Sequence, residues 1–278
     1  MKKAVHFLVY SSIYLALCAV VMCYQTSLLF NLASDEAFLC FVFFGTLCSY
    51  NFHWYFTYHP NPVSDRISWS LNNKPLHITL FCIGLVGASY TAFLLRAHWP
   101  ALLVSIAIAF LYSAPKVPLP IFKKLKRIAI GKTIFLALAW TFITAILPVM
   151  ISRVAWTPGM ETFAVNRFFF LYPICILFDY RDRTEDAAEG IRSMITQLDE
   201  KGVDVIFWGS VVVAVLSAGL LCYFGIRPEI CILLTLPAIL LAVLYKPSKK
   251  NKDDLHYYFL LDGLMMLSGL FLLLGSFT

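Results

Sequence analysis

The stretch that decides the fold is FFFLYPICILFDYRDRTEDAAEGIRSM, residues 168–194, in which an apolar run ends abruptly in charged residues. Asp179, Asp182 and Asp186 stand in it at positions i, i+3 and i+7. This spacing predicts that the three side chains share one face of a helix. Because three close carboxylates repel one another, a compensating cation is expected beside them.

The rest of the chain has the composition of a membrane protein. Of its 278 residues, 60% are hydrophobic and 14% are charged, whereas a soluble domain has about 25% charged residues. About 20 apolar residues in a helix cross the hydrocarbon core of a bilayer. We therefore predict an all-α integral membrane protein that forms a single domain over residues 1–278. Its nine transmembrane helices are expected at about 4–30, 36–58, 76–95, 98–113, 128–150, 163–179, 204–225, 229–245 and 256–277.

The basic residues predict how these helices are oriented. With the N-terminus inside, 18 of the 22 Lys and Arg residues fall on the inner side. The four exceptions are Arg96, Arg153, Arg167 and Arg227. Basic residues favour the cytoplasmic side of short loops. We expect a multi-pass protein of the bacterial inner membrane, with a cytoplasmic N-terminus and its working site on the cytoplasmic face. Orientation and anionic membrane lipids account for the net charge of +6, so no nucleic-acid partner is expected.

The eight cysteines all fall within the predicted helices, and none forms a CxxC pair. Zinc sites need clustered ligands, so this pattern argues against a zinc centre. We interpret the cysteines as small buried apolar residues.

The aspartate spacing instead favours a hard divalent cation. Mg²⁺ is typically held by one or two carboxylates together with water and substrate phosphates, and ionisable groups at a membrane edge are functional candidates. We expect Asp179, Asp182 and Asp186 to be ligands of Mg²⁺. The alternative is a solvated loop in which the neighbouring arginines balance the acids.

A second group of candidate residues lies in AFLYSAPKVPLPIFKKLKR, residues 109–127, at the end of the fourth predicted helix. Tyr112 and Lys116 are four residues apart, and Lys123, Lys124, Lys126 and Arg127 follow. Lysines beside a carboxylate-bound metal stabilise the negative charge that grows on a diphosphate leaving group. The alternative is that these lysines only set the topology and extend toward the interface.

Together these motifs resemble the UbiA superfamily of intramembrane prenyltransferases, the group of the 4-hydroxybenzoate polyprenyltransferases, and the resemblance runs nearly end to end. The family motif DxxDxxxD, followed by Gly, Ile or Lys, a basic residue and Ser or Thr, is matched by Asp179, Asp182 and Asp186 with GIRS at residues 190–193. The family's YxxxK element is matched by Tyr112 and Lys116, and its NRPL by NKPL at residues 73–76.

The first aspartate motif of the family, NDxxDxxxD, is altered in this chain. It would begin at Asn51, and its three acids are replaced by Phe52, Tyr55 and His59. The resemblance implies two Mg²⁺ ions that bridge the prenyl diphosphate, whereas this sequence has the ligands for one. His53 and His59 are candidates for phosphate contact, although such residues also belong to the aromatic belt of a membrane interface.

The resemblance implies an enzyme that transfers a prenyl group from a polyprenyl diphosphate to a lipid-soluble aromatic or isoprenoid acceptor. In this hypothesis Asp182, Lys116 and Tyr112 are catalytic. The diphosphate would be bound by Asn51, His53, Lys116, Lys124, Arg181 and Arg192.

Two other classes of function are weighed against this hypothesis. A catalytically impaired relative would bind a prenyl lipid or assist a partner enzyme. A transporter or a different lipid transferase fits less well, because the D-x2-D-G-x2-A-R stretch of the CDP-alcohol transferases is absent. Asp262, in the ninth predicted helix, has no partner that the sequence identifies, and a carboxyl group is costly there.

Overall fold

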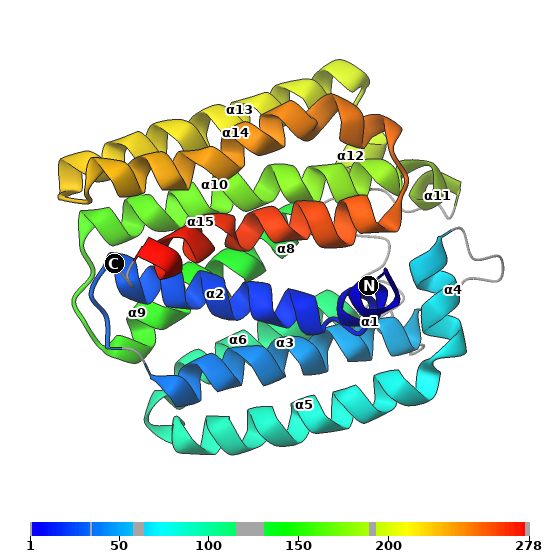
Figure 1. The fold of residues 1–278 in the computed structure, drawn as a ribbon, viewed down its shortest axis with the longest axis horizontal. Helices are drawn as coiled ribbons and strands as arrows, with labels where there is room; N and C mark the ends of the chain where they lie inside the picture. Colours follow the sequence, from blue (N-terminus) through cyan, green and yellow to red (C-terminus); the bar gives the residue numbers. More distant parts are fainter. Residues whose placement is uncertain (1, 34, 58–63, 115–130, 189–192, 276–278) are drawn as a thin grey trace.

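The computed structural model describes residues 2–33, 35–57, 64–114, 131–188 and 193–275. Within these ranges the chain folds into helices, without strands, as predicted, and the long helices lie side by side (Figure 1). The continuous long helices are α2 (Ile13–Leu29), α3 (Glu36–Phe56), α5 (Lys74–Leu94), α6 (Trp99–Ser113), α10 (Pro158–Arg181), α13 (Glu200–Leu220) and α14 (Pro228–Lys250).

Two further membrane helices contain π-helical turns. One consists of α8 (Lys132–Thr141), the π-helix η4 (Phe142–Ile146) and α9 (Leu147–Ser152), and the other of the π-helix η6 (His256–Leu261) and α15 (Asp262–Gly275). The shorter elements are α1 (Lys2–Tyr10), α4 (Asp65–Asn72), η1 (Arg96–His98), α11 (Arg183–Ala188), α12 (Met194–Gln197) and η5 (Leu221–Phe224).

The prediction of nine spans holds approximately. Among the described residues, seven helices are long and apolar enough to cross a membrane, and the bent pair of α1 and α2 makes an eighth. The remaining predicted segment is α6, which has 15 residues. The first predicted span was wrong in being continuous: α1 and α2 meet at 66°, because Ser12 adopts a left-handed conformation with φ 64°.

The exterior of the bundle is apolar, which identifies an integral membrane protein. Val86, Val205 and Ile232 are exposed over 70%, 71% and 69% of their surfaces. A bundle that faced water would carry charged side chains at such positions, since extended apolar patches are rare on soluble proteins. The long helices therefore present this surface to lipid.

Small residues let neighbouring helices approach closely, as is common in membrane bundles. A Cβ atom on Gly84 would lie 2.7 Å from the backbone nitrogen of Cys48, so α5 contacts α3 at this point. A Cβ atom on Gly269 would lie 2.8 Å from the side chain of Val21, which brings α15 against α2. These contacts fix the helices whose ends carry the polar residues described below.

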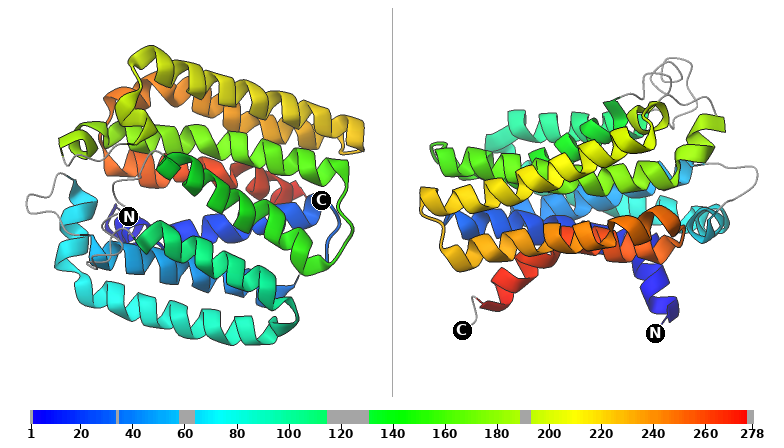
Figure 2. Two further views of the ribbon diagram at one scale, coloured as in Figure 1. Left: turned by 180° about the vertical axis from the view of Figure 1, so that it is seen from behind. Right: turned by 90° about the horizontal axis from the view of Figure 1, so that it is seen from above.

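The short helices α1, α4, α11 and α12 lie at one end of the bundle (Figure 1, right). We call this the motif end, because the C-terminal end of α10 places the aspartate motif there. Figure 2 shows that α1 and the last turns of α15 lean out of the bundle on the same side.

Candidate functional site

The spacing of the aspartate motif predicted a single continuous helix. The structure instead has a break within the motif. Helix α10 ends at Arg181, Asp182 forms its C-cap, and α11 begins at Arg183. The backbone carbonyl of Asp182 accepts hydrogen bonds from the backbone nitrogens of Glu185 and Asp186, at 3.1 and 2.9 Å. The break separates the three carboxylates into two groups with different partners.

The first group is Asp179 and Asp186, which share the ammonium of Lys132. The Lys132 nitrogen lies 3.3 Å from an oxygen of Asp179 and 3.8 Å from an oxygen of Asp186. The hydroxyl of Thr133 also donates to Asp179. Lys132 begins α8, so the first turn of α8 meets the last turn of α10 here, and the lysine side chain remains 39% exposed.

The second group is centred on Arg181, whose guanidinium binds Asp182. Asp182 therefore pairs with Arg181, whereas the other two aspartates pair with Lys132. The Nε of Arg181 donates to Asp182 at 2.7 Å, and one terminal nitrogen donates to the hydroxyl of Tyr258 at 2.8 Å. The other terminal nitrogen lies 3.6 Å from Asp254. The guanidinium also lies 4.7 Å from the ring centre of Tyr257, a cation–π distance.

Arg66 of α4 completes this second group and is itself buried. Its guanidinium lies between the rings of Trp54 and Tyr258, at 4.2 and 3.9 Å from their centres. Its backbone nitrogen donates to Asp254 at 2.8 Å, and its side chain donates to Ser12 at 3.3 Å. Burial lowers the pKa of Arg66 and raises the pKa of Asp254, although the backbone hydrogen bond from Arg66 acts in the opposite direction on Asp254.

An aromatic wall adjoins the first carboxylate group. The rings of His53 and Tyr112 stack at 5.2 Å and 13°, and Tyr50 lies 6.2 Å from both Tyr112 and Trp140. The indole nitrogen of Trp140 donates to the hydroxyl of Tyr50 at 3.1 Å. Tyr112 interacts electrostatically with Lys132 and Asp179. The structure therefore brings two of the predicted site residues, His53 and Tyr112, to the same region as Asp179.

Asn51 takes part in a different arrangement. It is buried, and its amide donates to the backbone carbonyls of Ser11 and Leu47 at 3.0 and 2.8 Å. Its side-chain oxygen lies 2.7 Å from a ring nitrogen of His77, and the other ring nitrogen lies 3.2 Å from the hydroxyl of Ser70. In the described part of the chain, Asn51 thus joins the break between α1 and α2 to α3, α4 and α5.

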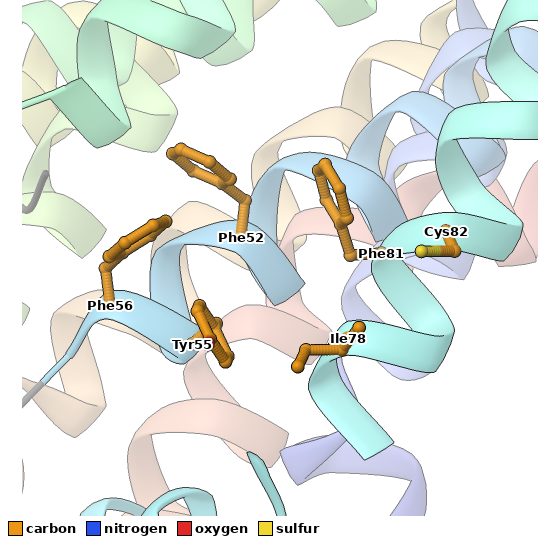
Figure 3. A pocket seen from close by; sticks show the side chains of 6 residues that line it. All are labelled: Phe52, Tyr55, Phe56, Ile78, Phe81 and Cys82. Atoms are coloured by element: carbon orange, nitrogen blue, oxygen red, sulfur yellow. The ribbon is translucent and has the colours of Figure 1, made fainter. Parts of the chain in front are cut away.

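Two of the three acid positions of the first aspartate motif hold aromatic residues, Phe52 and Tyr55. Phe52 and Tyr55 line a pocket of about 260 Å³ between α3 and α5 (Figure 3). The pocket is completed by Phe56, Ile78, Phe81 and Cys82. Neither Phe52 nor Tyr55 supplies a carboxylate, so these two positions offer no metal ligand of the family pattern.

Seven candidate residues from the sequence lie outside the described residues. These are His59, Lys116, Lys123, Lys124, Lys126, Arg127 and Arg192. Their proposed contacts with a diphosphate stay predictions.

Sequence reasoning missed Lys132 as a partner of the aspartates. It was counted only as a basic residue of an inner loop. The signal that could have found it is the polar pair Lys132–Thr133 at the start of an otherwise apolar segment. The buried Arg66 and Asp254 were missed because no local pattern distinguishes them from loop residues.

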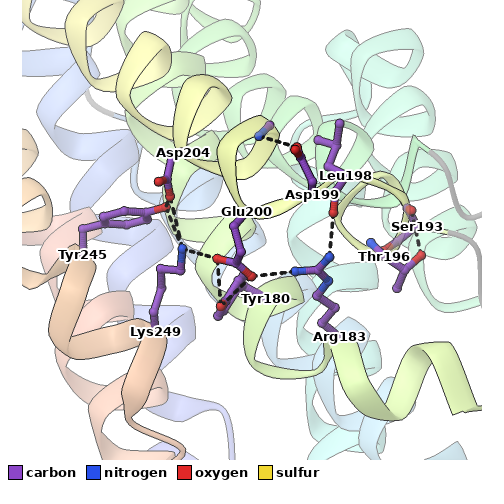
Figure 4. Close-up of polar contacts among 11 residues, drawn as sticks. Tyr180, Arg183, Ser193, Thr196, Leu198, Asp199, Glu200, Asp204, Tyr245 and Lys249 are labelled. Carbon is purple, nitrogen blue, oxygen red and sulfur yellow. Dashed lines mark hydrogen bonds and ion pairs between the residues drawn. The ribbon is translucent and has the colours of Figure 1, made fainter.

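A separate polar network holds the end of α10 from its other side (Figure 4). Glu200 of α13 accepts hydrogen bonds from Tyr180 at 3.0 Å and Arg183 at 2.9 Å, and it pairs with Lys249 of α14 at 2.6 Å. Lys249 also lies 3.1 Å from Asp204. These contacts join α10, α13 and α14 at the motif end.

A comparison with protein families identifies the family of this chain. The model of the UbiA prenyltransferase family matches residues 63–270, which is more than half of the chain. This chain belongs to the UbiA prenyltransferase family. The match begins beyond residues 51–59, where the first aspartate motif would lie.

The fold of this UbiA family member is also that of a solved relative. The apo structure of a UbiA homolog from Aeropyrum pernix K1 matches with a TM-score of 0.71 at 12% sequence identity. The match covers 94% of this chain and 98% of the other. No curated protein matches the chain.

UbiA family prenyltransferases generally use Mg²⁺, so the donor atoms of this chain can be tested for fit. No cluster of three or more His, Cys, Asp and Glu side chains suited to a metal occurs among the residues that the structure describes. Asp179 and Asp186 nevertheless converge on one cation, the ammonium of Lys132. Two carboxylates, with water and substrate phosphate, are enough for a single Mg²⁺. The second metal of the family pattern has no carboxylate at positions 52 and 55.

Proposed function

We propose that this chain, as a single domain over residues 1–278, transfers a prenyl group from a polyprenyl diphosphate to a lipid-soluble aromatic or isoprenoid acceptor. The observation that carries the proposal is the convergence of Asp179 and Asp186 on Lys132 at the membrane edge. Such a pair of carboxylates with an ammonium can bind a diphosphate together with one divalent cation. Membership of the UbiA family supports the same substrate class.

In this proposal the diphosphate lies at the motif end and the prenyl chain extends between the helices. Asp179 and Asp186 would hold one Mg²⁺, whose charge would stabilise the diphosphate as a leaving group. Lys132 donates to a diphosphate oxygen while remaining close to both carboxylates. Lys116, Lys124 and Arg192 are further proposed contacts, and Asp182 holds Arg181 beside the site.

Aromatic side chains adjoin the place where the allylic cation would form. The faces of Tyr112 and Tyr50 attract a cation, and the surrounding rings exclude water that would otherwise capture it. The hydroxyl of Tyr112 is proposed to donate to the leaving oxygen. His53, stacked on Tyr112, keeps that ring in place.

The basic residues at the motif end also support an orientation. Lys and Arg favour the cytoplasmic side, so we propose that the motif end and the N-terminus face the cytoplasm of a bacterial inner membrane. The substrate would then arrive from the cytoplasmic leaflet. The proposed partners are the prenyl diphosphate, the acceptor and membrane lipids, without nucleic acid.

The proposal is tested by product formation. Purified protein in detergent is given geranylgeranyl diphosphate, Mg²⁺ and an extract of membrane lipids, and mass spectrometry searches for acceptors that gain one geranylgeranyl group. Asp179→Asn is expected to abolish the product. Asp204→Asn is the matched control, because Asp204 also lies at the motif end but contacts Tyr245 and Lys249 instead. A wild-type protein that forms no prenylated product would contradict the proposal.

A further inference from the structure

The short helix α4 carries a buried arginine that the proposed diphosphate site does not use. Arg66 is only 2% exposed, and its guanidinium forms no ion pair with any residue that the structure describes. A buried charge is costly unless other contacts compensate for it. The contacts of Arg66 therefore identify the parts of the fold that this side chain joins.

Arg66 joins α4 to three other elements. Its guanidinium lies between the rings of Trp54 of α3 and Tyr258 of η6, at 4.2 and 3.9 Å from the ring centres. One terminal nitrogen donates to the hydroxyl of Ser12, at the break between α1 and α2, at 3.3 Å. Cation–π contacts are strongest where water is excluded. A lysine ammonium has no flat face to stack between two rings, so this position is suited to arginine.

Asp254 connects α4 to the end of α10. It is 4% exposed and lies just before η6. One of its carboxylate oxygens accepts a hydrogen bond from the backbone nitrogen of Arg66 at 2.8 Å, in the first turn of α4, where a helix favours negative charge. The other oxygen lies 3.6 Å from a terminal nitrogen of Arg181. Neither of these two atoms has a hydrogen-bond partner among the described residues, so their attraction for each other is not divided.

The guanidinium of Arg181 is held by three partners. One terminal nitrogen faces Asp254, the other donates to the hydroxyl of Tyr258 at 2.8 Å, and Nε donates to Asp182 at 2.7 Å. A planar guanidinium with three partners has a fixed orientation. Because Tyr258 also stacks on Arg66, two separate residues connect the two arginines. We call Arg66, Asp254, Tyr258 and Arg181 the arginine clamp.

The arginine clamp is attached to the place where the aspartate motif breaks. Arg181 is the last residue of α10, and Asp182 forms its C-cap. The backbone carbonyl of Asp182 accepts from the nitrogen of Asp186 at 2.9 Å, and α11 begins here. In a continuous helix, Asp179 and Asp186 would be separated by a rise of about 10.5 Å. Lys132 instead contacts them at 3.3 and 3.8 Å, so the break is what lets the two carboxylates converge.

We propose that the arginine clamp positions the aspartate motif, and that Arg66 is a positioning residue for Asp186, although it contacts neither Asp186 nor the substrate. The inference rests on the proposed function only for the identity of the ligands, a divalent cation and a diphosphate. The clamp itself needs neither ligand, because all its contacts lie within the protein. Loss of Arg66 or Asp254 releases Arg181, and the turn at Asp182 then loses its support.

The first test uses the protein without metal. Hydrogen exchange, followed by mass spectrometry, reports on the backbone amides of Glu185 and Asp186, which are bound by the Asp182 carbonyl. Arg66→Lys keeps the positive charge but loses the stacking, and Asp254→Asn keeps the shape but loses the negative charge. Because each change removes an interaction with a charged group, exchange in residues 183–188 is expected to become about tenfold faster in both variants.

Arg167→Lys is the matched control, because Arg167 is also a buried arginine. It is 3% exposed, stacks on Phe163 at 4.8 Å and donates to Gln25 at 2.8 Å. It precedes Arg181 in α10 by a rise of about 21 Å. This variant is expected to lower the thermal midpoint, as Arg66→Lys does, while residues 183–188 exchange at the wild-type rate.

The comparison with this control decides the proposal. If exchange in residues 183–188 is the same in Asp254→Asn and Arg167→Lys, the arginine clamp does not position the motif and the proposal is overturned. Asp254→Asn has nearly the wild-type volume, so it provides the comparison even where Arg66→Lys does not fold.

A second measurement connects the clamp to the ligands without turnover. The probe is farnesyl thiodiphosphate, in which sulfur replaces the oxygen that leaves, and its binding is titrated in detergent with Mg²⁺. Arg66→Lys and Asp254→Asn are each expected to weaken binding by about tenfold, and Arg167→Lys should bind as the wild type does. The double variant should bind no more weakly than either single variant, because both changes act through one clamp. Losses that multiply in the double variant would contradict a shared clamp.

The outcomes separate this inference from the proposed function. A wild-type protein that binds the analogue but forms no prenylated product would contradict the transferase proposal alone. A wild-type protein that does not bind the analogue would contradict the diphosphate site. In both cases hydrogen exchange in the metal-free protein still decides whether the clamp positions the motif.

Discussion

Replacing Lys132 with Met removes the ammonium that Asp179 and Asp186 share and keeps a side chain of similar length. At an effective dielectric constant of about 20, unit charges at 3.3 and 3.8 Å attract each other by about 5 and about 4 kcal/mol. Water screens much of this attraction, because the lysine side chain is 39% exposed, and the substitution also removes the cost of partly burying the ammonium itself. We expect a net loss of about 1–2 kcal/mol in the free energy of unfolding, which lowers the thermal midpoint by roughly 2–8 °C.

The same substitution is expected to weaken diphosphate binding. Without divalent metal, Lys132 is the described cation closest to Asp179, so its loss should reduce the affinity for farnesyl diphosphate by about tenfold. Added Mg²⁺ should restore part of that affinity, because the two carboxylates are then free of their ammonium partner. The assay is a binding titration in detergent with and without a chelator.

Lys201→Met is the matched control for this titration. Lys201 is an exposed lysine in the first turn of α13. Its replacement by Met causes the same change in net charge without altering a contact of the aspartates. If Lys132→Met has the midpoint and the diphosphate affinity of this control, the electrostatic reasoning about the site is refuted.

Two other substitutions test the packing and the charges around the site. Gly84→Ala is expected to lower the thermal midpoint, because the new Cβ would lie 2.7 Å from the backbone of Cys48. In the control Gly219→Ala the new Cβ meets no atom within 4 Å, so the midpoint should stay unchanged or rise. Equal midpoints for the two variants would contradict this packing argument. Burial raises the pKa of Asp254 above its ordinary 3.8, so the folded state binds this proton more tightly and the free energy of unfolding falls as the pH rises through the folded-state pKa. Asp254→Asn should flatten that fall in a series of thermal midpoints against pH, and a steeper fall in the variant would contradict the assignment.

The fold could be predicted to a large extent because its decisive features are local. Apolar length and the distribution of basic residues are read directly from the sequence, and all nine predicted segments are helical where they are described. The break at Ser11 and Ser12 was not predicted, since neither residue is a strong helix breaker. It depends on tertiary contacts, in which Asn51 binds the Ser11 carbonyl and Arg66 binds the Ser12 hydroxyl.

The candidate site could be predicted only in its residue types. The spacing of Asp179, Asp182 and Asp186 indicated a cation site, but the prediction of one continuous helical face was wrong because α10 ends at Arg181. The partners come from elements distant in sequence, such as Lys132 of α8 for Asp179 and Tyr258 of η6 for Arg181. A periodic pattern contains no information about such contacts, because they depend on how the helices pack.

The measurement that tests the central claim most directly is diphosphate release. Purified wild-type protein and Asp179→Asn are given farnesyl diphosphate and an extract of membrane lipids as the source of acceptor, with Mg²⁺ or with a chelator. The account predicts Mg²⁺-dependent release by the wild type and its loss in Asp179→Asn, with Asp204→Asn retaining the wild-type rate. Release that is equal in wild type and Asp179→Asn, or no release by the wild type under any condition, would contradict it.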